Sequence, residues 1–326
     1  MTKVVFMGTP DVTLPILDKL NADPDNEILR VYTAPDRQSG RGKTISMSPV
    51  KVFAEQHGLM VSQPVSLRDI NIQNELAALQ PDIIVVAAYG KFLPTSILKI
   101  PRHGCLNIHP SLLPLHRGPS PVISSILSDD KVTGTTLMLL DEGMDSGPII
   151  KQSEVVIHPL DTAESLTASL FTLGADLLSA YINPWMSGAI TAHTQNEAFA
   201  TITRKIGKAD GEISWSTEAR NLERQCRAFT PWPSLYTHWN NKLLKLLEVE
   251  VELDVPEINY EPGRVINLLN SDVPVGIATG DGILGVKQLQ IEGKPRTSIH
   301  QFLSGYPDFV GSLLGTLCES LHDQQK

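Results

Sequence analysis

The sequence predicts an α/β protein with a mostly parallel sheet covered by helices on both faces, followed by a small β-barrel. Short apolar runs alternate with amphipathic stretches in the first part of the chain, which is typical of strand–helix units. From about Gly188 this alternation stops, and short strand-like runs separated by turns follow. A chain of 326 residues is also longer than one ordinary domain and has room for both parts.

Two predicted strands of the first part are apolar runs without polar alternation, as in strands buried on both faces of a sheet. Residues 4–7 (VVFM) form the first run, and residues 81–88 (PDIIVVAA) form the strongest. Further strands are predicted at 28–33, 105–109, 135–140 and 149–157. Ligands of parallel sheets bind at the carboxyl ends of the strands, so we expect the site in the loops that follow them.

A turn at 8–11 is predicted to lead into a first helix that reaches about Leu20, and further helices are predicted at 48–57, 69–79 and 161–183. The second of them has Ser48 as its N-cap and Pro49 at its first position, a favourable pair for a helix start. The last opens at Asp161 with Glu164 three residues later, the spacing of a capping box. Pro184 is expected to end it, because proline lacks the backbone N–H that the helix needs.

The predicted domain boundaries follow the change in pattern near residue 188. We expect a Rossmann-like domain at 1–188, a linker at 189–208, an OB-like barrel at 209–318 and a tail at 319–326. The barrel region contains a predicted helix at 217–228 and strands at 242–251, 263–268, 275–278 and 285–289.

Composition excludes several classes of protein. The hydrophobic fraction of 41% is enough for a full core and shows no bias towards disorder. No apolar run approaches the roughly 20 residues of a membrane span, and the N-terminus lacks the features of a signal peptide. The three cysteines are far apart and form no CxxC pair, which argues for a reducing cytoplasm and against disulfides or zinc.

Charge and histidine spacing narrow the choice further. The net charge of −9 is unusual for a nucleic-acid binder, so any contact with phosphates must come from a local basic patch. The nine histidines show no HExxH-like spacing, so we expect no metal. The first strand is followed by Gly8-Thr9-Pro10 rather than GxGxxG, which argues against a dinucleotide-binding oxidoreductase.

Three polar residues form the best candidate for a chemical centre. Asn107 and His109 alternate along one predicted strand and therefore point to the same side. Asp145 lies in a glycine-bracketed loop after the next strand and could reach the imidazole if the two strands are neighbours. An amide can donate to an oxyanion, an imidazole can move protons, and a carboxylate can orient the imidazole. The alternative is structural: a turn cap, an interior histidine and a loop acid.

The segment 107–114 (NIHPSLLP) resembles the signature of the 10-formyltetrahydrofolate-dependent formyltransferases. Asp145, within LDEGMDSGP at 140–148, falls where that family has its aspartate. The resemblance implies that Asn107 and a protonated His109 stabilise the tetrahedral oxyanion and that Asp145 orients His109 and helps to relay the proton. The formyl donor implied is 10-formyltetrahydrofolate. The residues implied to line its pocket are Ser111, Leu112, Leu113, Pro114, Tyr89, Gly90, Phe92 and Leu93.

Further segments resemble the branch of this family that acts on initiator methionyl-tRNA, among them FMGTPD at 6–11, CRAFTPWP at 226–233 and ATGDGIL at 278–284. A basic loop distinguishes that branch, and here it contains Arg37, Arg41 and Lys43. The implied tRNA contacts are these three residues with Arg204 and Lys205, and the helix at 217–228 could continue a phosphate track. A monomer is expected. Leu115-His116 departs from the basic-then-aromatic pair that is frequent in the family.

Several alternatives stay open at this point. A formyltransferase for a glycinamide or a nucleotide sugar would use the same centre, although the basic loop and the barrel argue against it. A formyltetrahydrofolate hydrolase would use water as the acceptor and release formate. A non-catalytic RNA-binding module would need neither the three polar residues nor an acidic net charge.

Overall fold

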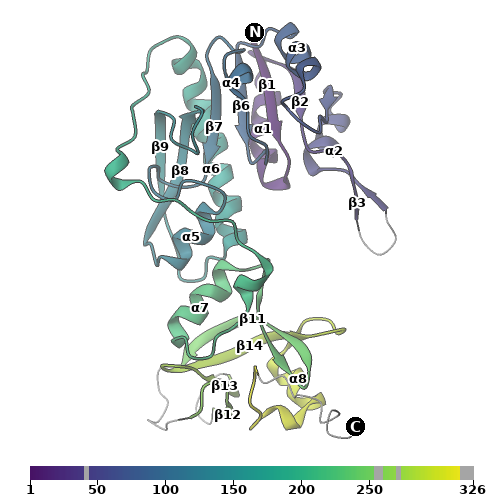
Figure 1. Cartoon of the computed structure of the whole chain (residues 1–326), viewed down its shortest axis with the longest axis vertical. Helices are drawn as coiled ribbons and strands as arrows, with labels where there is room; N and C mark the ends of the chain where they lie inside the picture. The colour runs from purple at the N-terminus through teal and green to yellow at the C-terminus, as the bar shows by residue number, and fades with distance from the viewer. Residues whose placement is uncertain (40–43, 253–259, 269–272, 316–326) are drawn as a thin grey trace, which may run out of the picture. The chain divides into compact units, whose positions relative to one another are not determined.

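The computed structural model describes residues 1–39, 44–252, 260–268 and 273–315 (Figure 1). These residues form two compact units. Unit 1 comprises residues 1–122, 131–157 and 165–204, and unit 2 comprises residues 123–130, 158–164 and the chain from Lys205 onward. Both units are thus assembled from separate stretches of the chain. The tail predicted at 319–326 lies outside the described residues.

Unit 1 is built on a seven-stranded sheet in the order β5-β2-β1-β6-β7-β8-β9. The strands are β1 (Thr2–Gly8), β2 (Asn26–Tyr32), β5 (Val61–Ser62), β6 (Ile83–Ala87), β7 (Cys105–His109), β8 (Val132–Leu139) and β9 (Ile149–Val156). Pairing is parallel from β5 to β7 and antiparallel for β8 and β9. The mostly parallel sheet predicted from the sequence is confirmed.

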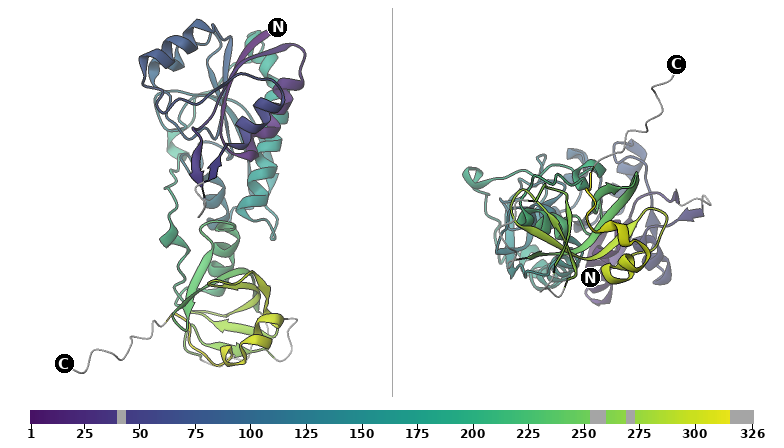
Figure 2. Two further views of the ribbon diagram at one scale, coloured as in Figure 1. Left: turned by 90° about the vertical axis from the view of Figure 1, so that its right-hand side faces the viewer. Right: turned by 90° about the horizontal axis from the view of Figure 1, so that it is seen from below.

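Helices cover both faces of this sheet (Figures 1 and 2). They are α1 (Leu14–Ala22), α2 (Pro49–Gln56), α3 (Ile70–Ala78), α4 (Thr95–Leu98) and α6 (Ala163–Met186). Unit 1 also has the short 3-10 turns η1 (Asp11–Thr13) and η2 (Glu197–Phe199), whereas α5 (Pro121–Leu127) belongs mostly to unit 2. Val4 and Phe6 of β1 join the core under α1, α2 and α6, whereas Val5 and Met7 join the core with α3 and α4. This alternation is what a strand buried on both faces produces.

The long helix α6 packs against the middle of the sheet. A Cβ atom added to Gly174 would lie 2.4 Å from Cγ2 of Ile108, so the glycine lets the helix approach β7 closely. Pro184 lies inside the helix, which continues to Met186 instead of ending at residue 183 as predicted. The proline stands in the last turn, where it removes only one helical hydrogen bond. By length and composition α6 could cross a membrane, but Leu170 and Leu178 are among its side chains buried in the core.

The basic loop is a short hairpin. Its strands are β3 (Arg37–Ser39) and β4 (Thr44–Ser46), which pair antiparallel and which the sequence did not predict. Residues 40–43 are outside the described residues. Asp36 anchors the start of the hairpin, because its carboxylate accepts hydrogen bonds from Lys51 (2.5 Å) and Gln63 (2.8 Å). These bonds lower the pKa of Asp36 below its ordinary value.

Unit 2 is a curled antiparallel sheet in the order β10-β11-β14-β13-β12, with β15 paired to β14 (Figure 2). Its elements are η3 (Lys208–Gly211), α7 (Ala219–Ala228), β10 (Leu235–Trp239), β11 (Lys242–Glu252), β12 (Val265–Asn267), β13 (Val275–Ala278), β14 (Ile283–Ile291), β15 (Thr297–Ser298), α8 (Ile299–Gly305) and η4 (Pro307–Phe309). Trp239 of β10 packs edge-on against Phe302 and Phe309, with ring centroids 5.8 and 5.2 Å away. These aromatic contacts pack α8 and η4 against β10.

Candidate active site

Strand β7 carries two of the three predicted centre residues. It lies between β6 and β8, where Asn107 is opposite Val86 on one side and Met138 on the other, and His109 is opposite Thr136. Asn107 and His109 are 9% and 4% exposed, so both residues are largely removed from water. In the described part of the chain the Asn107 amide makes no hydrogen bond. Its N–H donors therefore stay free to meet a substrate oxygen.

The third residue, Asp145, reaches this place by an indirect route. Because β8 runs antiparallel to β7, it ends at Leu139 opposite Leu106, three residues before His109. The loop at 140–148 must therefore turn back along β7 by about 10 Å to bring Asp145 to the imidazole. Asp145 has a left-handed backbone (φ 52°), and its Oδ2 accepts a hydrogen bond of 2.8 Å from the Gly118 N–H.

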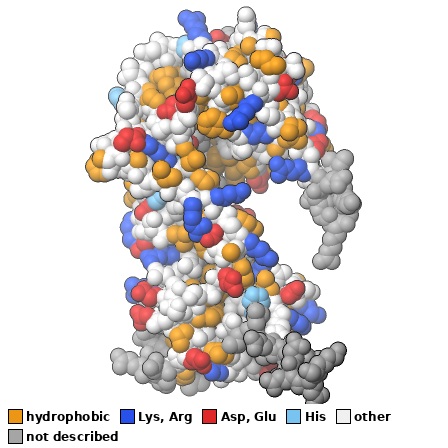
Figure 3. Space-filling model, in the orientation of Figure 1, with side chains coloured by type: hydrophobic (Ala, Val, Ile, Leu, Met, Phe, Trp, Pro, Cys, Tyr) orange, Lys and Arg blue, Asp and Glu red, His pale blue; other side chains and the backbone are white. Residues whose placement is uncertain are grey.

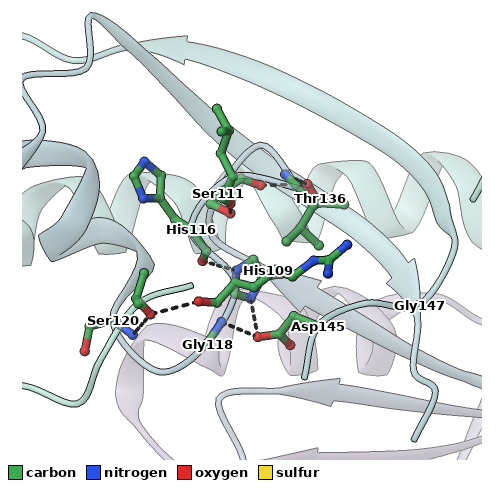
Figure 4. A network of polar contacts seen from close by, with 12 residues as sticks. His109, Ser111, His116, Gly118, Ser120, Thr136, Asp145 and Gly147 are labelled. Atoms are coloured by element: carbon green, nitrogen blue, oxygen red, sulfur yellow. Dashed lines mark hydrogen bonds and ion pairs between the residues drawn. The ribbon is translucent and has the colours of Figure 1, made fainter. Parts of the chain in front are cut away.

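His109 lies between Asp145 and His116 (Figure 4). Its Nδ1 is 3.7 Å from Asp145 Oδ2, and its Nε2 is 3.1 Å from the carbonyl oxygen of His116. A carbonyl oxygen can only accept, so Nε2 must carry the hydrogen in this contact. Nδ1 is then the nitrogen that can take up a second proton, beside the carboxylate. The predicted centre of Asn107, His109 and Asp145 is thus brought together.

Burial and charge act in opposite directions on His109. Burial lowers the pKa of its imidazole below the ordinary value, and the carboxylate of Asp145 and the His116 carbonyl partly offset this. The net direction is downward, so the neutral ring is favoured when no substrate is bound. A neutral ring can accept a proton during a reaction, and the Asp145 carboxylate then stabilises the positive charge of the protonated ring.

Side-chain hydrogen bonds fix residues 111–114, the segment predicted to contact the donor. The hydroxyl of Ser111 is buried and donates to the Leu115 carbonyl at 2.7 Å, so it is not available to a ligand. Thr136 Oγ1 donates to the Ser111 carbonyl at 2.6 Å, and Gln152 donates to the Leu113 carbonyl at 2.8 Å. Leu112 is half-buried and packs over Gly134, where a Cβ would lie 2.5 Å from its Cδ2.

The second predicted segment follows β6. Tyr89 and Leu93 are buried in the core, whereas Phe92 is 63% exposed. Gly90 has φ 77°, and a Cβ at this position would meet no atom within 4 Å. Open space beside Gly90 and the exposed ring of Phe92 are what this stretch offers to a ligand. Burial raises the pKa of the Tyr89 phenol, so it stays protonated.

Three of the five predicted tRNA-contact residues lie in the described part of the chain. Arg37, Arg204 and Lys205 are exposed, and Arg41 and Lys43 lie outside the described residues. On α7, Arg224 pairs with Asp129 (3.0 Å) and Arg227 with Glu223 (2.6 Å). These pairs offset two of the charges that could have extended a phosphate track. On the face shown in Figure 3, basic and acidic side chains are interspersed.

Sequence reasoning missed a group of polar residues next to Asp145. Arg117 is 5% exposed and donates to Gln195 and Glu197, and Gln195 in turn donates to the backbone of the Asp145 loop. Thr203 also belongs to this group, because it accepts from the Ser120 N–H at 3.1 Å. The only signal was the RGPSPV segment at 117–122, and the partners lie in a stretch without periodicity. In the described ranges no cluster of three His, Cys, Asp or Glu side chains could hold a metal ion.

Two protein-family models match this chain. Residues 2–182 match the formyl transferase family, and residues 205–307 match the formyl transferase C-terminal domain. A methionyl-tRNA formyltransferase of Roseiflexus castenholzii is 43% identical over 90% of this chain and 92% of its own length. Another of the same name, from Alkaliphilus oremlandii, is 38% identical over 96% of this chain and 99% of its own.

Solved structures with the same fold are more distant in sequence. An N-formyltransferase of Helicobacter canadensis, solved with folinic acid and dTDP-3-aminofucose, has a TM-score of 0.64 at 19% identity and covers 88% of this chain and 98% of its own. HypX of Aquifex aeolicus, solved with tetrahydrofolic acid, has a TM-score of 0.60 at 17% identity and covers 95% of this chain and 48% of its own. At these identities the likeness shows the fold alone.

Proposed function

The chain belongs to the formyl transferase family, and from that premise we propose that it transfers the formyl group of 10-formyltetrahydrofolate to the α-amino group of initiator methionyl-tRNA. The observation that carries the proposal is similarity over 90–96% of the chain to relatives named methionyl-tRNA formyltransferase, at 38–43% identity. The product is an N-formylmethionyl-tRNA, which serves the initiation of translation. We assign the protein to the cytoplasm and expect a monomer.

The geometry of the centre supports a role for each of its residues. The amine nitrogen attacks the formyl carbon, and negative charge develops on the formyl oxygen. Asn107, whose amide is free of partners in the described residues, donates to that oxygen. The low exposure of both Asn107 and His109 strengthens such a contact, because little water competes with it.

His109 manages the proton. An α-amino group has an ordinary pKa of about 7.7–8.0 and gives up a proton as it forms the new bond. Neutral His109 can accept this proton at Nδ1, and the imidazolium then lies beside Asp145 and keeps its Nε2–H bond to the His116 carbonyl. The charged ring adds to the stabilisation of the oxyanion. When the tetrahedral intermediate collapses, the C–N10 bond breaks and the proton goes to N10 of the leaving tetrahydrofolate.

The donor pocket fits this chemistry through backbone and apolar surface. The 111–114 segment is fixed by Thr136 and Gln152, so it presents a rigid edge to a flat ring system. Gly90 leaves open space and Phe92 adds an exposed aromatic ring. We propose that Ser111 contributes through its backbone, because its hydroxyl is occupied.

The acceptor is proposed to contact the basic residues around the hairpin and after residue 203. Arg37 is exposed at the start of β3, and Arg204 and Lys205 are exposed beyond the 201–203 stretch. Contacts with phosphates would place the methionine while carrying no sequence information themselves. Arg41 and Lys43 are proposed to act with Arg37.

A formylation assay with four acceptors tests the proposal. Labelled 10-formyltetrahydrofolate is offered with initiator methionyl-tRNA, elongator methionyl-tRNA, a nucleotide-linked amino sugar and glycinamide ribonucleotide, and free formate is measured without an acceptor. We expect transfer to the initiator tRNA first. Transfer only to a small molecule would identify a small-molecule formyltransferase. Release of formate at the same rate without an acceptor would identify a hydrolase.

A further inference from the structure

We propose that Gln195 is a positioning residue for Asp145 and that Arg117 and Glu197 hold Gln195 in its own orientation. The proposal rests on the proposed function and extends it, because these residues lie outside the predicted centre and would set its geometry. Arg117 follows the donor-contact segment, whereas Gln195 and Glu197 come from the stretch after α6. Sequence analysis predicts a linker there, with tRNA contacts at Arg204 and Lys205 and no role for Gln195 or Glu197.

The Gln195 amide uses its whole hydrogen-bonding capacity. Its Nε2 donates to the carbonyl oxygens of Asp145 and Gly147, both at 2.8 Å. Its Oε1 accepts from Nε and Nη2 of Arg117, at 3.0 and 2.8 Å. A primary amide has two N–H donors and two acceptor lone pairs, so all four are occupied. Because Gln195 is 5% exposed, water cannot replace any of these partners at low cost.

Arg117 fixes which way the amide faces. A guanidinium only donates, so it orders the amide with Oε1 toward itself and Nε2 toward the Asp145 loop. Glu197 accepts from the other edge of the guanidinium in a bidentate pair, with distances of 2.9 and 2.7 Å. The pair lowers the pKa of Glu197, so this carboxylate stays charged and balances Arg117.

The Asp145 loop needs such a support. Residues 141–144 are exposed, and Thr95 donates a hydrogen bond to the Glu142 carboxylate at 2.9 Å. The backbone carbonyl of Asp145 is bound by Gln195, while the Gly118 N–H binds its carboxylate at 2.8 Å. The left-handed backbone of Asp145 is unfavourable for a residue with a side chain, so it depends on bonds of this kind. Together they fix the carboxylate relative to His109.

The stretch around Gln195 is itself anchored on both sides. His193 exchanges two backbone hydrogen bonds with Ile149, at 2.7 and 2.8 Å. Thr201 accepts from the Arg117 N–H at 2.9 Å, and Thr203 donates to the Arg117 carbonyl at 2.7 Å. Gln195 therefore starts from a backbone that is fixed, which is what allows one amide to position a loop.

The experiment compares Gln195→Leu and Gln195→Glu with a matched control, Gln73→Leu. Gln195→Glu keeps the acceptor for Arg117 and loses both N–H donors, so it serves if Gln195→Leu does not fold. Gln73→Leu removes a hydrogen bond that the Gln73 amide donates to the Leu67 carbonyl oxygen (2.9 Å), elsewhere in unit 1. The measurements are kcat and KM for both substrates and the NMR titration of the His109 ring. Asp145 and His116 are the groups that act on this titration.

Both Gln195 variants are expected to lose about 100-fold in kcat with unchanged KM, because the carboxylate is displaced by a fraction of an ångström to an ångström. In Gln195→Leu the His109 titration should move to lower pH, since the Asp145 carboxylate that raises its pKa has moved away. Gln195→Glu adds a carboxylate of its own, which acts in the opposite direction on the His109 pKa, so this variant is judged by kcat. Gln73→Leu should change neither. A folded Gln195 variant with wild-type kcat and an unchanged His109 titration would overturn the proposal. If the wild-type protein transfers no formyl group, the proposed function fails, and the titration still tests the positioning role.

Discussion

Nδ1 of His109 lies 3.7 Å from Oδ2 of Asp145, too far for a hydrogen bond and close enough for a strong charge interaction. The carboxylate raises the pKa of His109 against a larger lowering by burial. Asp145→Asn should therefore move the His109 titration to still lower pH, because the opposing effect is lost and the desolvation remains. NMR of the ring protons measures this directly. An unchanged or higher titration midpoint would contradict the role of Asp145.

The same substitution bears on turnover. With Asp145 neutral, the imidazolium formed during proton transfer loses its partner, so kcat should fall while donor binding is kept. The acid limb of the pH–rate profile should shift in the same direction as the NMR titration. Opposite directions in the two measurements would show that another group controls the limb.

Asn107→Ala should lower kcat by about 10²–10³ without unfolding the protein, because it removes one donor to the oxyanion. The side chain makes no hydrogen bond within the described residues, so its loss leaves no buried partner unpaired. The thermal midpoint should accordingly stay close to that of the wild type. Near-normal turnover in this variant would remove Asn107 from the centre.

Gly174→Ala should destabilise unit 1 by about 1 kcal/mol, although alanine is the better helix former. The added Cβ would meet Ile108 at 2.4 Å and Thr135 at 3.0 Å. Ser169→Ala on the exposed side of the same helix is the control and should be neutral or slightly stabilising. Urea unfolding measures both. A stabilised Gly174→Ala variant would mean that helix and sheet can separate freely.

The combined change Arg204→Ala and Lys205→Ala should weaken binding of the tRNA and leave the KM for the formyl donor unchanged. Each lost phosphate contact reduces the slope of log K against log salt by about 1. Lys99→Ala, an exposed lysine outside the proposed surface, is the control. Filter binding at several salt concentrations gives the slope. A slope equal to that of the wild type would exclude both residues from phosphate contact.

The fold was predictable where it depends on local pattern. The sequence correctly predicted β1, β6 and β7 from their apolar runs and the start of α2 from its cap at Ser48. Strand burial and helix capping leave a pattern in residues that are close together in the sequence. The direction of β8 was not predictable in this way, because it depends on pairing with distant strands. Strand β10 (LYTHW) was missed too, as its register depends on β11 and not on its own alternation.

In the candidate site, too, only the features that depend on local pattern were predictable. Asn107 and His109 share a strand face, which alternation predicts. The approach of Asp145 could not be derived, because it requires a loop that doubles back along β7 and a left-handed backbone. Ser111 illustrates the limit of a motif: its position was predicted, but its hydroxyl is committed to Leu115. Gln195 gave no local signal, since its partners are 48 or more residues away.

The saturated amide of Gln195 has a consequence for how this sequence can change over evolutionary time. Replacing Gln195, Arg117 or Glu197 alone leaves a polar or charged group without its partner, and for the buried members such a loss costs about 1–3 kcal/mol. A chain with marginal stability tolerates few such steps. We therefore expect the three positions to be replaced together or not at all among functional descendants, so that the stretch after α6 changes in step with the Asp145 loop.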